Sequence, residues 1–459
     1  MRMMALLKRV WERLNAAQLA SLSFIAVIFA GSFVLMLPIS HRGRLHYVDA
    51  LFTSTSAVCV TGLTVVDTGT KFTGFGQAVI LALIQIGGLG VMTLSTFLLF
   101  LMKKRASLQA SDAVGGSFLK LRYYSLSKMI AGALFITLSF EAVGAVALFI
   151  RWLPDHGAAG AVWHAIFHSV SAFCNAGFSL NSDGLVSYAD DPAVNLVIMS
   201  LVIFGGIGFF VIIDLWDTVS RHPEAVRRRL SFHSRIVLTM TVMLAIGGAL
   251  ALFLVERRYN FYPLTPYQAG IRSLFQSVTA RTAGFNTVNI GQLSDVSLFI
   301  LIFLMFVGAA PGSTAGGVKV TTLGVLIMVV ISRVRRMSMP GFFGRSVDRR
   351  DLERALALVF LASVLIAGAT MLLLSVETGG APHPQTRGMF LELFFEVVSA
   401  FGTVGLSTGV TPKLEPASKI ALSVLMLVGR VGPMTLIYAM SRSRPGAGYH
   451  YPSEQIMIG

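Results

Sequence analysis

The chain has 459 residues, of which 54% are hydrophobic and only 13% are charged. A soluble domain usually has about a quarter of its residues charged, so this composition excludes an ordinary water-exposed surface and indicates a lipid environment. The net charge of +15 would also suit a nucleic-acid-binding protein. However, the sequence shows no basic patch organised with aromatic residues for base stacking, so we expect no nucleic-acid partner.

Eight apolar stretches, each long enough for about 20 helical residues, predict membrane-spanning helices. They cover residues 18–37, 77–102, 128–150, 194–216, 236–255, 297–330, 352–376 and 420–440. Most of the 37 lysines and arginines lie in the stretches 1–16, 103–128, 218–235, 331–354 and 441–459. Because basic residues favour the cytoplasmic side, this pattern predicts a multi-pass protein with both termini in the cytoplasm.

A shorter, half-apolar stretch lies within each successive pair of spans. These stretches cover residues 46–57, 162–172, 267–280 and 390–400. Each is too short to cross a bilayer, and each is followed by glycine-bearing sequence that does not favour a helix. Non-helical backbone at membrane depth is tolerated only where it is buried in protein or lines a water-filled path. The four re-entrant stretches therefore predict a pore.

Two markers recur in the same order in all four units. The first is an aromatic residue, then Ser/Thr-Ala, then a glycine, and it reads LFTSTSAVCVTG (51–62), IFHSVSAFCNAG (166–177), LFQSVTARTAG (274–284) and FFEVVSAFGTVG (394–405). The second reads GGLG (87–90), GGIG (205–208), GAAPG (308–312) and GRVGP (429–433). This recurrence predicts an internal fourfold repeat, with units 1–110, 111–225, 226–345 and 346–445 and a tail 446–459.

The end of each re-entrant stretch is the predicted ion-binding filter. Rings of backbone carbonyls can replace the hydration shell of a potassium ion, and glycine permits the backbone angles that aim carbonyls at an axis. A single glycine here would be explained by helix capping, but four between spanning helices favour a filter. The predicted filter residues are Val60, Thr61, Gly62, Asn175, Ala176, Gly177, Thr282, Ala283, Gly284, Thr403, Val404 and Gly405.

These filters, the stretch 308–319 and the stretch 429–433 resemble the Trk/Ktr/HKT superfamily, and within it the KtrB-type membrane subunits of bacterial potassium uptake systems. The resemblance covers nearly the whole chain. It implies an all-α polytopic membrane protein with four helix–pore-loop–helix repeats around a central pore of pseudo-fourfold symmetry. It also implies potassium selectivity, because some sodium-transporting plant relatives have serine at the position of Gly62.

The stretch 308–319 predicts a broken helix with a flexible plug, which the resemblance makes an intramembrane gate. Its gate residues are Gly308, Ala309, Ala310, Pro311, Gly312, Ser313, Thr314, Ala315, Gly316, Gly317 and Lys319. A phosphate-binding loop is disfavoured, because Val318 separates the glycine from the lysine. Arg430, inside an apolar span, is expected to face the protein interior. The resemblance makes Arg430 a gate residue, and a structural pairing with Glu396 or Glu392 stays open.

The resemblance implies further partners. They are potassium bound in the filter, a homodimer mate reached by the tail 446–459, and a cytosolic nucleotide-binding (RCK/KTN) ring subunit. It places the chain in the bacterial inner membrane and leaves sodium as a candidate activator. We expect no covalent cofactor and no enzymatic activity, because the sequence shows no nucleophile, base or metal cluster. A sodium- or proton-coupled potassium symporter is the alternative to a channel-like pore.

Overall fold

The computed structural model describes residues 16–106, 126–219, 230–336, 341–342 and 344–432. The tail 446–459, expected to reach a homodimer mate, lies outside the described residues, as does 433–440 of the last predicted span. Helices make up most of the described chain. Its single sheet consists of the two-residue strands β1 (Gly341–Phe342) and β2 (Arg345–Ser346), which pair antiparallel.

The helices can be followed in four groups along the chain. The first holds α2 (Ala16–Leu35), α3 (Tyr47–Val58), the one-turn α4 (Thr68–Lys71) and α5 (Gly74–Ala106). The second holds α6 (Leu126–Phe173), α7 (Pro192–Ile207) and α8 (Phe209–Val219). The third holds α9 (Phe232–Glu256), α10 (Pro266–Thr279), α11 (Asp295–Phe306) and α12 (Val320–Val334). The fourth holds α13 (Arg349–Thr378), α14 (Met389–Gly402) and α15 (Pro416–Val431).

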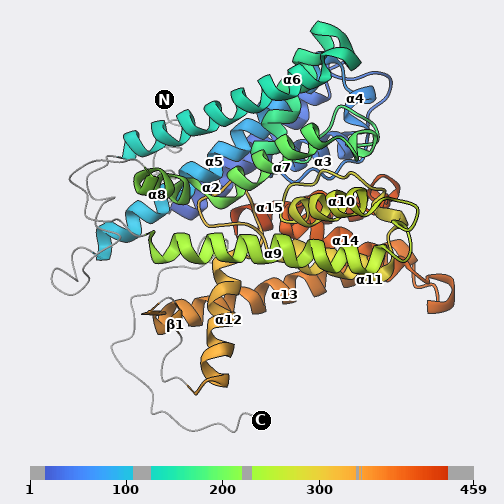
Figure 1. The fold of residues 1–459 in the computed structure, drawn as a ribbon. Helices are drawn as coiled ribbons and strands as arrows, with labels where there is room; N and C mark the ends of the chain where they lie inside the picture. The colour runs from blue at the N-terminus through green and yellow to red at the C-terminus, as the bar shows by residue number, and fades with distance from the viewer. Residues whose placement is uncertain (1–15, 107–125, 220–229, 337–340, 343, 433–459) are drawn as a thin grey trace, which may run out of the picture.

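The long helices α5, α6, α9 and α13 run along one common direction in Figure 1, whereas α12 leaves the bundle at a steep angle. The shorter helices pack among them: α3 contacts α2 and α5, α10 contacts α9, and α14 contacts α13 and α15. Contacts between the groups close a cycle, because α5 meets α6, α7 meets α10, α11 meets α14 and α15 meets α3. The first group therefore touches the last.

The distribution of polar side chains is the reverse of that in a soluble protein. Helix α3 buries the consecutive Thr53, Ser54, Thr55 and Ser56, while large apolar side chains such as Phe135 on α6 and Phe360 on α13 are exposed. An apolar exterior suits lipid, and polar groups in the interior then need internal partners. The short central helices carry many of those groups.

Two glycines interrupt the helices of the second group, and the break at Gly157 falls where the sequence prediction separates two segments. Gly157, with φ 66° and ψ 171°, breaks α6 between the predicted span 128–150 and the re-entrant stretch that follows. Gly208, with φ 87°, separates α7 from α8, which are bent by 99°. The predicted span 194–216 is therefore a bent pair of helices, a bend that the sequence did not indicate. At this bend the chain contacts the stretch 308–319, because the Phe209 N–H donates to the Gly312 carbonyl at 3.3 Å.

Each of the eight stretches that the sequence predicts as spans contains helix within its described part, but fewer single helices reach spanning length. By length and composition three described helices suffice, at Ile130–Phe173, Phe232–Glu256 and Arg349–Thr378, or four if the bent pair α7 and α8 counts as one. In the third group, α11 ends at Phe306 and α12 starts at Val320, with non-helical chain between them. In the fourth, Gly432 follows α15 with φ 90°.

Candidate functional site

The backbone adopts the left-handed conformation just after the C-terminal ends of α3, α6, α10 and α14. Val60, Asn175, Thr282 and Thr403 have φ values of 54°, 60°, 76° and 51°. They account for all but one of the non-glycine residues with positive φ in the described chain. Such conformations cost about 1–3 kcal/mol each and persist only where the surroundings enforce them, typically at functional sites. All four occupy the first position of a predicted filter stretch.

The four glycines that close these stretches contact one another in a cycle. Their φ values are all positive, at 93° for Gly62, 67° for Gly177, 79° for Gly284 and 93° for Gly405. A side-chain carbon on each glycine would collide with backbone of the next stretch. The obstructing carbonyls belong to Ala176 for Gly62, Ala283 for Gly177, Val404 for Gly284 and Thr61 for Gly405. The structure thus brings all four predicted filter stretches together at one place.

The Ser of the repeated motif supports three of the four filter stretches through its hydroxyl, whereas the hydroxyl of Thr279 in the third unit is buried without a hydrogen-bond partner. In the first stretch the Gly62 N–H donates to Ser56 Oγ at 3.0 Å, and in the fourth the Gly405 N–H donates to Ser399 Oγ at 3.1 Å. In the second, Ser171 Oγ donates instead to the Phe178 carbonyl at 2.8 Å. These bonds satisfy backbone groups that have no other route to water.

Three glycines of the second marker are required for the same structural reason, which the sequence alone did not indicate. A Cβ atom on Gly87, Gly205 or Gly429 would collide with a carbonyl at the end of a re-entrant helix. The carbonyls belong to Val58, Phe173 and Phe401, respectively. Glycine is therefore required because the backbone of the second span touches the base of the filter. In the third group Gly308 instead faces the carbonyl of Gly316.

The stretch 308–319 is tied to two neighbouring groups of helices. The Ala310 N–H donates to the Gly206 carbonyl at 3.0 Å. Thr314 Oγ1 donates to the Phe173 carbonyl at 3.3 Å, at the base of the second filter. The Gly316 N–H donates to the hydroxyl of Thr403 at 3.1 Å, in the fourth filter. The stretch therefore contacts the fourth filter stretch directly, and it contacts the chain just before the second filter stretch.

Two basic side chains bind carbonyls of this same stretch. Lys319 Nζ donates to the Ala315 carbonyl at 2.6 Å. Arg430, nearly fully buried, donates from Nη1 to the Thr314 carbonyl and from Nη2 to the Gly87 carbonyl at 2.8 Å. Arg430 thereby links α15 of the fourth group, α5 of the first and the stretch 308–319.

The proposed pairing of Arg430 with a buried carboxylate is wrong for Glu396. That carboxylate accepts hydrogen bonds from Ser407, Thr408 and Thr411 instead. None of the ion pairs found in the described chain joins Arg430 to Glu392. Arg430 uses backbone carbonyls as partners, and these cannot be recognised from residue types.

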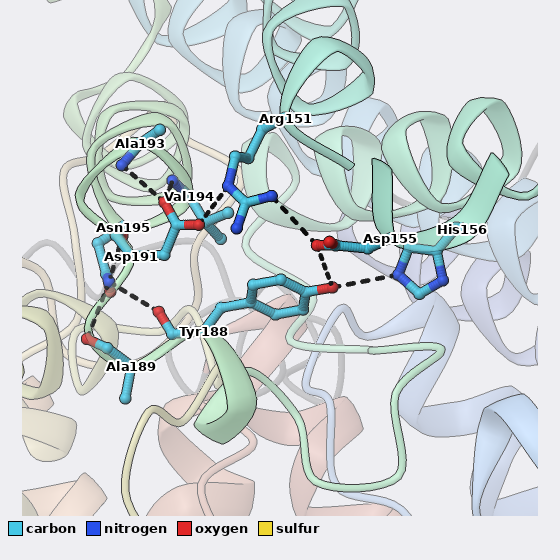
Figure 2. A network of polar contacts seen from close by, with 9 residues as sticks. All are labelled: Arg151, Asp155, His156, Tyr188, Ala189, Asp191, Ala193, Val194 and Asn195. Atoms are coloured by element: carbon cyan, nitrogen blue, oxygen red, sulfur yellow. Dashed lines mark hydrogen bonds and ion pairs between the residues drawn. The ribbon is translucent and has the colours of Figure 1, made fainter. Parts of the chain in front are cut away.

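A polar network braces the chain that leaves the second filter (Figure 2). Arg151 on α6 forms ion pairs with Asp155 and with Asp191, and Asp191 also caps α7 by accepting from the Ala193 and Val194 N–H groups. The Tyr188 hydroxyl donates to Asp155 at 3.2 Å. Partial burial, and then the Asp155 charge, raise the pKa of Tyr188 to about 12, so this hydroxyl remains a donor at neutral pH.

Ion pairs also join the groups to one another. Arg272 on α10 contacts both oxygens of Asp190, from the loop before α7, at 2.9 and 2.8 Å. Lys419 on α15 pairs with Asp49 on α3 at 3.0 Å, with side chains only 12% and 15% exposed. The latter pair connects the fourth group to the first. Nothing in the spacing of these residues along the chain predicts either pair.

Comparison with known proteins adds an independent line of support. The model of the TrkH family, described as a cation transport protein, matches residues 14–449. The Ktr system potassium uptake protein B of Vibrio alginolyticus is 38% identical, over 95% of this chain and 94% of its own length. The potassium/sodium uptake protein NtpJ of Enterococcus hirae is 37% identical, over 98% of this chain and 99% of its own length.

A solved structure also resembles the fold. The potassium transporter TrkH from Vibrio parahaemolyticus matches with a TM-score of 0.69 and 22% sequence identity. The match covers 92% of this chain and 83% of that one. At this level of identity the likeness concerns the arrangement of the helices.

Proposed function

We propose, because this chain belongs to the TrkH family of cation transport proteins, that it takes up potassium across a membrane as a channel-like pore. The family resemblance inferred from the motifs is confirmed. The apolar helices and the family together make the chain a multi-pass membrane protein. Potassium uptake is the function named for its Ktr relatives.

The observation that carries the proposal is the cycle of contacts among Gly62, Gly177, Gly284 and Gly405. Backbone oxygens from four stretches converge there, and oxygen ligands in a ring are what a dehydrated potassium ion requires. No Asp or Glu occurs in the filter stretches 60–62, 175–177, 282–284 and 403–405. Neutral carbonyls bind a monovalent ion weakly enough for it to leave, which rapid conduction needs.

The gate in this proposal is the stretch 308–317 with Lys319 and Arg430. Its hydrogen bonds to Thr403 and to the Phe173 carbonyl hold it against the filters. The positive charges of Lys319 and Arg430, bound to its carbonyls, oppose the entry of a cation. Conduction then requires the stretch to move away from the filters and to carry these charges from the path.

The assembly belongs to the same proposal. The inner membrane of a bacterium, cytoplasmic termini, a homodimer and a cytosolic nucleotide-binding (RCK/KTN) ring subunit all follow from the resemblance. The basic stretches 103–128, 218–235 and 331–354 would offer the ring a docking surface with an excess of positive charge. Sodium stands as a candidate activator, and the relative NtpJ is named for uptake of both ions.

Ion uptake into liposomes that contain the purified chain tests the proposal. We expect rubidium to enter in preference to sodium, and Gly62→Ser to lower the rubidium-to-sodium ratio by about tenfold, or about 1.4 kcal/mol of relative binding free energy. The matched control is Gly409→Ser, because Gly409 also has a positive φ of 96° but has open space where the side chain would go. An equal loss of preference in both variants, or none in Gly62→Ser, would contradict the filter.

A further inference from the structure

Arg281 breaks the equivalence of the four filters. The residue that follows the motif alanine is Val58 in the first unit, Phe173 in the second and Phe401 in the fourth, but Arg281 in the third. Arg281 directly precedes Thr282, the first residue of its filter stretch. One of the four filter stretches therefore has a permanent positive charge next to it in the chain, since guanidinium groups stay protonated in proteins.

The surroundings of Arg281 leave this charge without a counter-ion. The residue is 5% exposed, and its Nε atom is buried without a hydrogen-bond partner. None of the ion pairs within the described residues includes it. In contrast, Arg272 on the same re-entrant segment is neutralised by both carboxylate oxygens of Asp190. The field of Arg281 is therefore not cancelled by a neighbouring carboxylate.

Two features make this burial tolerable. Arg281 lies just past the C-terminal end of α10, where the helix dipole is partly negative and favours a cation. The side chain also lines a cavity of about 10 Å³ together with Thr241 on α9, Gly206 on α7 and Ala309 of the stretch 308–319. This is close to the volume that one water molecule needs. Neither the dipole nor one neutral water removes the positive charge.

We propose that Arg281 sets the discrimination of the filter between monovalent and divalent cations. This inference rests on the proposed filter function. The repulsion energy between a fixed positive charge and a divalent cation is twice the repulsion energy for a monovalent cation at the same site. Arg281 adjoins Thr282 in the chain, and it lies in a buried interior where salt screens charge poorly. The other three filter stretches supply carbonyls without an adjacent charge. Potassium therefore still binds, whereas divalent ions, which are repelled more strongly, are excluded.

Barium block of rubidium uptake tests the proposal, because barium is a divalent ion close to potassium in radius. We expect Arg281→Gln to tighten half-maximal block by external barium by about tenfold, and to lower the half-saturating rubidium concentration only about threefold, since the electrostatic energy doubles with ion charge. A general disturbance of the filter would shift both ions alike. The matched control is Arg272→Gln, because the side chains of Arg272 and Asp190 are 20% and 40% exposed. Solvent screens the carboxylate that this substitution leaves unpaired, so both values should shift much less than in Arg281→Gln.

Conservative replacement gives a second reading. Arg281→Lys keeps the charge and should retain barium block near the original value. If Arg281→Gln does not fold, Arg281→Met removes the same charge without placing a polar group in the buried site, and should tighten the block likewise. Tightened block in Arg281→Lys, or unchanged block in folded Arg281→Gln, would overturn the assignment. Gly62→Ser in the same liposomes separates the two proposals. If it lowers the rubidium preference while Arg281→Gln leaves barium block unchanged, only the role of Arg281 fails.

Discussion

Thr403 combines a strained backbone with two structural duties. Its φ and ψ of 51° each lie in the left-handed region, which a β-branched residue rarely adopts. Its carbonyl and backbone belong to the fourth filter stretch, while its hydroxyl accepts the Gly316 N–H. One residue therefore joins the predicted filter to the predicted gate. Movement of the stretch 308–317 must break this bond and change the support of Thr403.

Loss of the Ser399 hydroxyl should damage the filter selectively. Its hydroxyl accepts the buried Gly405 N–H at 3.1 Å. Ser399→Ala leaves that donor unsatisfied, which costs about 1–3 kcal/mol. We therefore expect a lower melting temperature, measured on detergent-solubilised protein, and a smaller rubidium-to-sodium uptake ratio.

The control for Ser399 lies on α15. Ser423 is also poorly exposed, but its hydroxyl bonds only the Lys419 carbonyl of its own helix at 2.9 Å. Ser423→Ala should change neither the melting temperature nor the uptake ratio measurably. Equal effects of the two substitutions would show that the Ser399 hydroxyl has no special role in the filter.

At the scale of residues, the sequence indicated the positions of the filter but not their backbone. Glycine marks Gly62 and its counterparts because it alone permits the close approach of a neighbouring carbonyl. Val60 and Thr282 gave no such signal, because the left-handed φ of these β-branched residues is imposed by tertiary contacts against local preference. The partners of Arg430 were missed for a different reason. They are backbone carbonyls, which every residue has, so no side-chain type marks them.

At the scale of elements, the stretch 308–319 is held in place by a small number of hydrogen bonds. Its ties to neighbouring groups run through Thr403, Arg430 and the Gly206 carbonyl. A net contribution of about 1 kcal/mol is usual for one hydrogen bond, so a few such bonds suffice to keep the stretch closed most of the time. They are also few enough to be overcome by a bound partner.

Deletion of residues 312–316 should therefore raise rubidium flux on the order of tenfold, which needs only about 1.4 kcal/mol of lost closing energy. The deletion removes Thr314 and Gly316, which make the contacts with Arg430 and Thr403. The measurement is initial rubidium uptake at matched protein content. Because the filter residues stay, the rubidium-to-sodium ratio should change much less than the flux. Unaltered flux would remove the gate assignment.

The break of the second span shows where sequence patterns lose information about elements. The motif at 205–208 has glycine at three positions, and all three read as packing contacts. The structure keeps Gly205 and Gly206 inside α7 and breaks the chain only at Gly208. The difference is the neighbour, since the carbonyls of the stretch around Gly312 face Gly208. A contact 104 residues away in the chain cannot be derived from the local motif.

At the scale of the whole molecule, a channel and a coupled symporter make different thermodynamic demands. A potassium channel dissipates the potassium gradient alone, whereas a symporter must also respond to sodium or protons. In planar bilayers we expect the reversal potential to follow the potassium gradient, with about 59 mV for each tenfold change. Equal changes in sodium or in pH at fixed potassium should leave the reversal potential in place. A shift with either ion gradient would favour the symporter.

The cycle of contacts among the four groups has a consequence for how the protein is made. Chains emerge from the ribosome N-terminus first, so the first group enters the bilayer long before the last. Asp49 therefore has no ion-pair partner until Lys419, 370 residues later in the chain, has been made. In the same way, the backbone at Thr61 lacks its packing neighbour until Gly405 has been made. Until translation reaches α15, the carboxylate of Asp49 lacks the cation with which it pairs. We expect products truncated before α15 to be recognised by membrane quality-control proteases. Full-length chains should escape them, because α15 then packs against the first group and supplies Lys419 to Asp49.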